Sequence, residues 1–504
     1  MHTTPPTPAG SPASHVTGST QDDRLSARSI TVLAVAAATL STVVGGVIPA
    51  GIAATGTIVF PAAFVAIAVL YGLFAVGFLA AARRFPTIDA AGAFYTLLRH
   101  SLGRIIGVGA AWVVIIAYAA LTVGLYGLVG SMTSALSAEM FRETVPWQAG
   151  ALIAVAIVAA VGLVGVEIGT RVLKVLIVLE IAMIAVVTAA NLTHPSPGGY
   201  TVEPFAVTTV APGAVSAVLA LGVLGYIGTE LTVVYSHSSR SGARGVARAT
   251  YATIAILTVV YVTASYAMIV TLGRDTLLAR AAADPGAVFA GTAAANLGPI
   301  AALGVRALVA TSVLAGAVSF HWATSRYALF LGRDRALPAF LGRTGRRNGT
   351  PVAASLAQTA AAVAAIIAVT MAGADPVQTL FYVAGTAGSI GILLVLTLTA
   401  LAIVLMFARR DTAHPPRRRW ILSASIASAM LLVALVISVL DHLDVLLGVS
   451  PDSAFPVVIG GVYLALFALG ALWAAAGPRT RSADTAGPSP LGDRGTPADT
   501  GDDR

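Results

Sequence analysis

Four polar side chains with acid–base or ion-binding chemistry lie inside long apolar stretches of the sequence. Glu180 stands within LKVLIVLEIAMIAVV, Glu230 follows GYIGT, and Ser319 and His321 lie within VLAGAVSFHWAT. An ionisable side chain in a stretch long enough to span a membrane is energetically costly, and it is a functional candidate by default. These four residues are therefore the first candidates for ion coupling or substrate binding.

Glu180 is a candidate proton carrier. It lies about eight residues into its apolar stretch, which at roughly 1.5 Å per residue places it about 12 Å deep, near the middle of a bilayer. Burial in an apolar medium disfavours the charged form of a carboxyl group, so such a group readily takes up a proton. The alternative is a carboxyl group that only packs there, satisfied by a neighbouring hydroxyl group.

The other three polar residues carry alternative interpretations. Glu230 either contacts a ligand or accepts hydrogen bonds from unwound backbone beside it. A serine such as Ser319, if it faces the first apolar stretch, would help to bind an ion or orient Glu180. His321 is a candidate for ion coupling, although a lone histidine in an apolar helix is more often a hydrogen-bonded packing residue.

Two apolar stretches are interrupted by residues that disfavour helices. The first reads VVGGVIPAGIAATG, with glycines and a proline between Gly45 and Gly51. The sixth reads LGVLGYIGTE, with three glycines before Glu230. Interrupted spans at corresponding positions of two halves are typical of a transporter site at a repeat interface.

A broken helix bares peptide groups, and each unpaired group in a membrane costs several kcal/mol unless something satisfies it. We expect the second half of the first span to begin at PAGIAATG, where free N–H groups suit a carboxylate and Gly51 allows close approach. The alternative is a kink or close helix packing. Tyr226 is expected to act as an aromatic gate, and Tyr118 either contacts substrate or packs. The predicted substrate-binding residues are Ile48, Pro49, Ala50, Gly51, Ile52, Tyr118, Tyr226, Ile227, Gly228 and Glu230.

The elements that must position these residues are membrane-spanning helices. Of the 504 residues, 57% are hydrophobic and 10% are charged, against about 45–50% and about 25% in soluble domains. The apolar residues fall in blocks of roughly 20 or more, the length that crosses a hydrocarbon core of about 30 Å. The sequence predicts an all-α integral membrane protein with twelve transmembrane helices, of which helices 1 and 6 are discontinuous. The spans are expected near 30–54, 59–82, 105–136, 147–165, 172–191, 212–237, 249–272, 301–331, 352–373, 377–408, 420–440 and 455–476, with short amphipathic helices near 91–104 and 284–297.

The two broken spans suggest internal symmetry. They open two sets of five helices, and because five is odd, the second set must be inserted upside down. The predicted transporter domain, 30–476, then contains inverted repeats over about 30–191 and 212–408 and two extra helices within 420–476. The polar stretches 1–29 and 478–504 are predicted to be disordered cytoplasmic tails.

Charge predicts orientation rather than a nucleic-acid partner. With the N-terminus inside, twenty Lys and Arg residues fall in inner loops and four in outer loops, which is the asymmetry of a cytoplasmic inner face. Both termini are therefore expected in the cytoplasm of a multi-pass plasma-membrane protein, and we expect a bacterial one. The net charge is +8, but the basic residues do not form the stripe with interleaved aromatic residues that is typical of nucleic-acid-binding proteins. The absence of cysteine excludes thiol chemistry.

Five motifs give the chain its resemblance to a known family. They are VVGGVIPAGIAATG, RRFPTIDAAGAFYTLLRHSLGR, GYIGTE, ARGVARAT and SRYALFLGRDRALP. With these motifs the chain, over about 30–475, resembles the amino acid permease branch of the amino acid–polyamine–organocation (APC) superfamily. The resemblance implies a five-plus-five inverted repeat and alternating access around a midplane site between spans 1, 3, 6 and 8. It also implies that the substrate carboxylate rests on Gly51 and its neighbours, and that the amino group meets carbonyls near both breaks.

The chain departs from this family at two places. Some proton-driven relatives carry a lysine in span 5, and that position falls on Glu180 here, so a carboxyl group replaces a fixed ammonium group. Coupling to protons, to Na⁺ or to exchange therefore stays open. The family often has two acids after span 6, where this chain has HSSRSGARG, so an inner-gate contact is missing or replaced by His237.

The predicted function is secondary active import of an amino acid or a related amine, coupled to protons. A neutral substrate is favoured because the expected site has no extra acid for a cationic side chain. A cationic amino acid or polyamine permease, or an exchanger, is the alternative. A non-transporting nutrient sensor on this scaffold would need a large folded cytoplasmic domain. Enzyme motifs such as a P-loop, HExxH and GxSxG are absent. The expected partners are the substrate and the lipid bilayer, with no cofactor or metal beyond a coupling proton or Na⁺, and the oligomeric state stays open.

Overall fold

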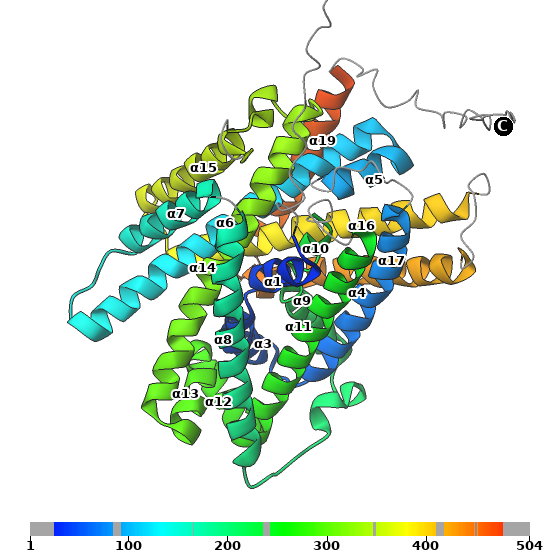
Figure 1. The fold of residues 1–504 in the computed structure, drawn as a ribbon. Helices are drawn as coiled ribbons and strands as arrows, with labels where there is room; N and C mark the ends of the chain where they lie inside the picture. The colour runs from blue at the N-terminus through cyan, green and yellow to red at the C-terminus, as the bar shows by residue number, and fades with distance from the viewer. Residues whose placement is uncertain are drawn as a thin grey trace, which may run out of the picture.

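The computed structural model describes residues 25–83, 92–164, 166–234, 242–345, 349–409, 418–447, 449–450 and 452–476. Most of the predicted tail 1–29, all of 478–504, and His237 lie outside these residues. The regular elements in the described part of the chain are helices, packed as a bundle with α1 (Ala27–Ala37) near its middle (Figure 1).

Ten helices in the described chain are long and apolar enough to cross a membrane. The first combines α1 with α2 (Leu40–Thr42), the π-helix η2 (Val43–Val47) and α3 (Ile48–Thr55). The others are α4 (Phe60–Ala82), α6 (Arg104–Phe141), α8 (Val166–Thr193), α11 (Gly242–Leu272), α14 (Pro299–Arg333), α15 (Val352–Met371), the π-helix η9 (Val377–Gly385) with α16 (Thr386–Ala408), α17 (Arg418–Asp441) and α19 (Phe455–Ala476).

Shorter helices complete the bundle. The apolar helices α7 (Trp147–Val164) and α9 (Pro212–Leu224) occupy the two remaining predicted stretches. The predicted amphipathic helices are present as α5 (Ala93–Leu102) and α13 (Val288–Leu297). The structure adds α10 (Leu231–Val234), α12 (Arg274–Ala283), η7 (Pro285–Ala287), η8 (Ala339–Gly342) and α18 (Leu443–Leu447), with η4 (Glu203–Phe205) and η5 (Val207–Thr209).

The first span is broken, but not where the glycines and proline predict. Helix α1 ends at Ala37, and Thr39 has φ 47° and ψ 61°, the left-handed region. From Leu40 the chain is helical without interruption to Thr55. The expected break at Gly45–Gly51 is therefore wrong, because Gly45 and Gly46 lie in the π-helix and Pro49 and Gly51 lie in α3, which continues it. The wider turn of the π-helix lies directly before Pro49, whose ring would collide with the carbonyl four residues earlier in a regular α-helix.

The sixth span is broken where predicted. Helix α9 ends at Leu224, and residues 225–230 form tight turns closed by i to i+3 hydrogen bonds. Gly228 has φ 111°, a conformation that side chains with a Cβ rarely adopt. The chain then resumes as the short helix α10.

Helix α1 is surrounded by α8, α11 and α14, and α14 also packs along α6 (Figure 1). At about 1.5 Å per residue, the 35 residues of α14 reach about 50 Å. Residues near one end of α14 therefore act at the opposite face of the bundle from those near its other end.

Candidate functional site

The breaks of spans 1 and 6 lie against each other. A Cβ on Gly228 would stand 2.9 Å from the amide nitrogen of Ala38, so only glycine allows the two backbones to approach this closely. The hydroxyl of Tyr261 on α11 lies 3.0 Å from the carbonyl of Gly225 and 3.3 Å from that of Ala38. One fully buried side chain thus donates toward a bared carbonyl of each break.

Glu180 caps the second half of span 1. Its Oε1 accepts a hydrogen bond from the amide of Ser41 at 2.5 Å and another from the hydroxyl of Ser312 at 2.6 Å. The Ser41 amide belongs to the first turn of a new helical segment, where N–H groups have no partner within the helix. An acidic side chain is favoured at such a positive helix end. Because the side chain is only 2% exposed, Glu180 ties α8, α2 and α14 together inside the bundle.

Glu230 caps the break of its own span. Its Oε2 accepts a hydrogen bond from the amide of Gly228 at 2.8 Å, and its Oε1 receives a long one of 3.4 Å from the hydroxyl of Tyr118. The ring of Tyr118 packs on that of Phe320, with centroids 5.8 Å apart. Of the two interpretations of Glu230, the geometry matches hydrogen bonding to the unwound backbone.

A cavity of about 370 Å³ lies beside the two breaks, a size within the range of small-molecule sites. It extends from Thr39 and Gly46 of span 1 to Leu125 of α6, Phe320 of α14 and Phe381 of η9. Arg306, which is exposed, also lines it, so the cavity opens toward the N-terminal end of α14.

Most predicted substrate-binding residues lie outside this wall. Only two of the ten, Ala50 and Ile227, line the cavity. Gly51 does not present backbone to a ligand, because a Cβ there would overlap the ring of Phe60. The hydroxyl of Tyr226 bonds the carbonyl of Phe64 at 3.1 Å and Thr258 at 2.9 Å. The others that do not line it are Ile48, Pro49, Ile52, Tyr118, Gly228 and Glu230.

The expected ion-coupling residues do not gather at one place. The serine that bonds Glu180 is Ser312 and not Ser319, although both lie buried on α14. His321 bonds the hydroxyl of Ser355 on α15 through Nε2 at 2.8 Å. A Cβ on Gly162 would stand 2.9 Å from its ring. These contacts fit the packing role for His321.

Sequence reasoning missed three residues of the site. Thr42 lines the cavity with a buried hydroxyl that has no hydrogen-bond partner in the described structure, and such an orphan group needs an explanation such as a ligand or water. Tyr261 of α11 contacts both breaks, and Ser312 of α14 donates to Glu180, which caps the first break. The residue types give no signal for these roles, since span 1, α11 and α14 each carry several hydroxyl side chains.

Comparison with known proteins identifies the family. A family model described as amino acid permease matches residues 30–481. The chain belongs to the amino acid permease family. The permease is therefore a multi-pass membrane transporter, and the resemblance found from its motifs is confirmed.

The permease also resembles solved structures. Three crystal structures of mutants of a manganese transporter from Eremococcus coleocola match with TM-scores of 0.51, 0.50 and 0.53, each at 15% identity. They cover 88%, 88% and 93% of the permease and 94%, 94% and 97% of the transporter chains. At this identity the likeness shows a shared fold alone. No curated protein matches the chain.

We predict that Tyr261→Phe lowers the thermal stability of the permease. The change leaves the buried carbonyls of Ala38 and Gly225 without their shared donor, and an unsatisfied buried group costs about 1–3 kcal/mol. The Tm of the purified protein in detergent should fall by a few degrees. Tyr251→Phe on the same helix, where the ring is 44% exposed, is the control. Equal Tm values for the two variants would contradict this role.

Proposed function

We propose that the permease imports an amino acid with an uncharged, apolar side chain by alternating access, driven by protons that bind Glu180. The observation that carries the proposal is the cavity that lies directly on the breaks of spans 1 and 6. Twelve spans in two inverted sets of five, with two further helices, are part of this proposal. The break in span 6 at the position matching that in span 1 supports it.

The cavity wall supports the class of substrate. It is mostly aliphatic and aromatic, and among the described residues its one charged side chain is Arg306. A cationic side chain or a polyamine would require a carboxylate that this wall does not supply, since a buried charge is costly unless it is paired. A carboxylate and an amine on the substrate would instead meet the polar groups at the breaks, where Thr42 and Thr39 line the cavity.

The position of Glu180 supports proton coupling. Its carboxylate bonds an amide next to one break and a hydroxyl on α14, so its charge acts where the two helices meet. Protonation removes the charge that strengthens both hydrogen bonds. A proton on Glu180 would therefore loosen the attachment of span 1 to α14, which links ionic state to helix position.

Uptake by purified protein in proteoliposomes tests the function. A panel of labelled amino acids, polyamines and Mn²⁺ should give saturable uptake only for amino acids with apolar side chains, and more of it when the pH on the cavity side is lowered. If only Mn²⁺ or only a polyamine showed saturable uptake, the proposed amino acid substrate would be wrong. Substrate binding without uptake would favour the nutrient-sensor alternative.

Gly46 offers a test of the cavity as the side-chain site. It lines the cavity, and a Cβ there would meet nothing within 4 Å, so a larger side chain would extend from it into cavity space. We predict that Gly46→Leu weakens uptake of leucine or phenylalanine at least tenfold more than uptake of alanine, because each displaced CH₂ is worth about 0.8 kcal/mol. Gly72→Leu, equally unobstructed but on α4 away from the cavity, is the matched control. An equal loss for large and small substrates would exclude this site.

We predict that Glu180→Gln removes the pH dependence of uptake while substrate binding is largely retained. The amide oxygen can still accept from Ser41 and Ser312 but cannot take up a proton. Wild-type uptake should rise as the cavity-side pH falls, because protons enter with substrate, and uptake by the variant should stay level. Glu203→Gln, at an exposed ion pair with Arg274, is the control. A pH profile unchanged in Glu180→Gln would refute the proton-carrier role.

A further inference from the structure

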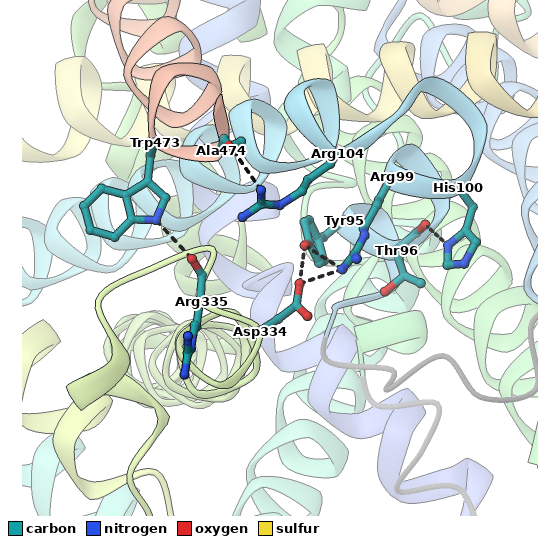
Figure 2. Close-up of polar contacts among 9 residues, drawn as sticks. All are labelled: Tyr95, Thr96, Arg99, His100, Arg104, Asp334, Arg335, Trp473 and Ala474. Carbon is teal, nitrogen blue, oxygen red and sulfur yellow. Dashed lines mark hydrogen bonds and ion pairs between the residues drawn. The ribbon is translucent and has the colours of Figure 1, made fainter. Parts of the chain in front are cut away.

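A compact polar cluster joins α5 to the C-terminal end of α14 (Figure 2). Asp334, the residue directly after α14, accepts hydrogen bonds from the hydroxyl of Tyr95 and the guanidinium of Arg99 on the same oxygen, Oδ2. The Arg99 bond measures 2.8 Å, and Arg99 also donates to the Tyr95 hydroxyl at 3.2 Å. Tyr95 and Arg99 stand one turn apart on α5, so both reach the acid from one helix face.

The cluster is partly shielded from water. The side chains of Arg99 and Asp334 are 20% and 27% exposed. Burial and the hydrogen bond to Asp334 raise the pKa of Tyr95, so its hydroxyl remains a donor. The ring of Tyr95 also lies edge-on to Phe330, one turn before Asp334, with centroids 6.0 Å apart. Apolar packing and charge thus hold α5 on the same turn of α14.

The turn that follows Asp334 is held by two tryptophans. Trp112 on α6 donates its indole N–H to the carbonyl of Ala336 at 3.0 Å, and Trp473 on α19 donates to that of Arg335 at 3.0 Å. The centroids of the two indole rings lie 6.0 Å apart. Arg335 has φ 56°, a left-handed conformation that a fixed surrounding must maintain.

Two hydrogen bonds attach the last turn of helix α19 to the rest of the bundle. Besides the bond from Trp473, Arg104 at the start of α6 donates to the carbonyl of Ala474 at 2.8 Å (Figure 2). This helix packs on α6 and lies outside the two proposed sets of five. Its last turn therefore supports the structure that carries Asp334.

The cluster and the cavity mouth lie at opposite ends of α14. Arg306 and Val309 line the cavity from the first third of the helix, whereas Asp334 directly follows its last residue, Arg333. Val309 and Asp334 are about 38 Å apart at roughly 1.5 Å per residue. One end of the bundle is therefore open at the cavity mouth, and the other end is held closed by hydrogen bonds and an ion pair. This arrangement is one of the two states that alternating access requires.

We propose that Tyr95, Arg99 and Asp334 form a latch that keeps the end of the bundle opposite the cavity mouth closed, and that α19 supports the latch through Trp473. Opening at that end requires α5 to separate from α14, and the latch bonds break in that step. In the orientation predicted from the basic residues, this end faces the cytoplasm. The latch thus biases the protein toward the state with an outward-open cavity.

The chain contains no cysteine, so single introduced cysteines report the two ends without background. Val309→Cys lies on the cavity wall. Ala75→Cys lies in a small buried pocket that is also lined by Phe94 of α5. The rate of maleimide labelling of each reporter in the purified full-length protein measures how often each end is open.

Asp334→Asn and Tyr95→Phe should each speed labelling of Ala75→Cys and slow labelling of Val309→Cys. We expect a change of about threefold to tenfold, the effect of losing a partly shielded charged hydrogen bond. Arg99→Asp should do the same, and combining it with Asp334→Arg should restore much of the original pattern. Rescue by charge exchange separates a latch from a merely structural role. Trp473→Phe should shift both rates in the same direction, by less.

Two matched controls accompany these variants. Glu203→Gln breaks the ion pair with Arg274, which lies outside the latch, and Trp420→Phe changes a 61% exposed tryptophan. Neither should move the two labelling rates in opposite directions. Unchanged rates in Asp334→Asn and Tyr95→Phe, or no rescue in the exchanged pair, would overturn the latch. Because the reporters need no substrate, these outcomes are independent of which solute the permease carries.

Discussion

Main-chain groups bared inside a membrane have to find partners within the protein, and this requirement organises the centre of the permease. A spanning helix that stops and restarts leaves amides and carbonyls that lipid cannot satisfy. Glu180 takes the amide of Ser41, Glu230 takes that of Gly228, and Tyr261 lies within reach of carbonyls on both sides. The three side chains come from three spans, so each break is held by the fold around it.

Under the proposed function, the acid at the first break has two roles. As a cap it stabilises a helix end, and as an ionisable group it makes that stability depend on protonation. A fixed cation, as in the lysine of some relatives, could neutralise charge at this place but could not accept the Ser41 amide. The carboxyl group provides an acceptor in both protonation states, while its charge is present in only one. The observed helix cap and the proposed proton-dependent switch thus coincide in one residue.

The sequence predicted the sixth span better than the first. Three glycines precede Glu230, and a positive φ at Gly228 with tight turns around it uses that composition directly. In the first span the break falls at Thr39, a β-branched residue in a left-handed conformation. A β-branched side chain disfavours the left-handed conformation, so tertiary contacts must hold Thr39 in it. The glycines and Pro49, which marked the wrong place, shape a π-helix on the cavity wall instead.

The same limit explains which site residues were missed. Intramembrane acids can be recognised by their cost, so Glu180 and Glu230 stood out, and both bind bared backbone. Ser312 and Ser319 lie two turns apart on nearly the same face of α14, so the choice between them depends on the height at which α14 meets Glu180 of α8. The apolar wall at Leu125 and Phe381 has no chemical signature at all. Spacing along one helix cannot decide which neighbour each face meets, so these contacts required the packed structure.

Helix α14 connects the consequences of these contacts. Its N-terminal part lines the cavity, its middle holds Ser312 against Glu180, and its C-terminal end carries Asp334. The structure has one continuous α-helix from Pro299 to Arg333, so a single ladder of hydrogen bonds joins these three places. A change in the bond between Ser312 and Glu180 would then be felt at both ends of the helix. In the proposed mechanism, α14 therefore links protonation of Glu180, access to the cavity and closure of the far end.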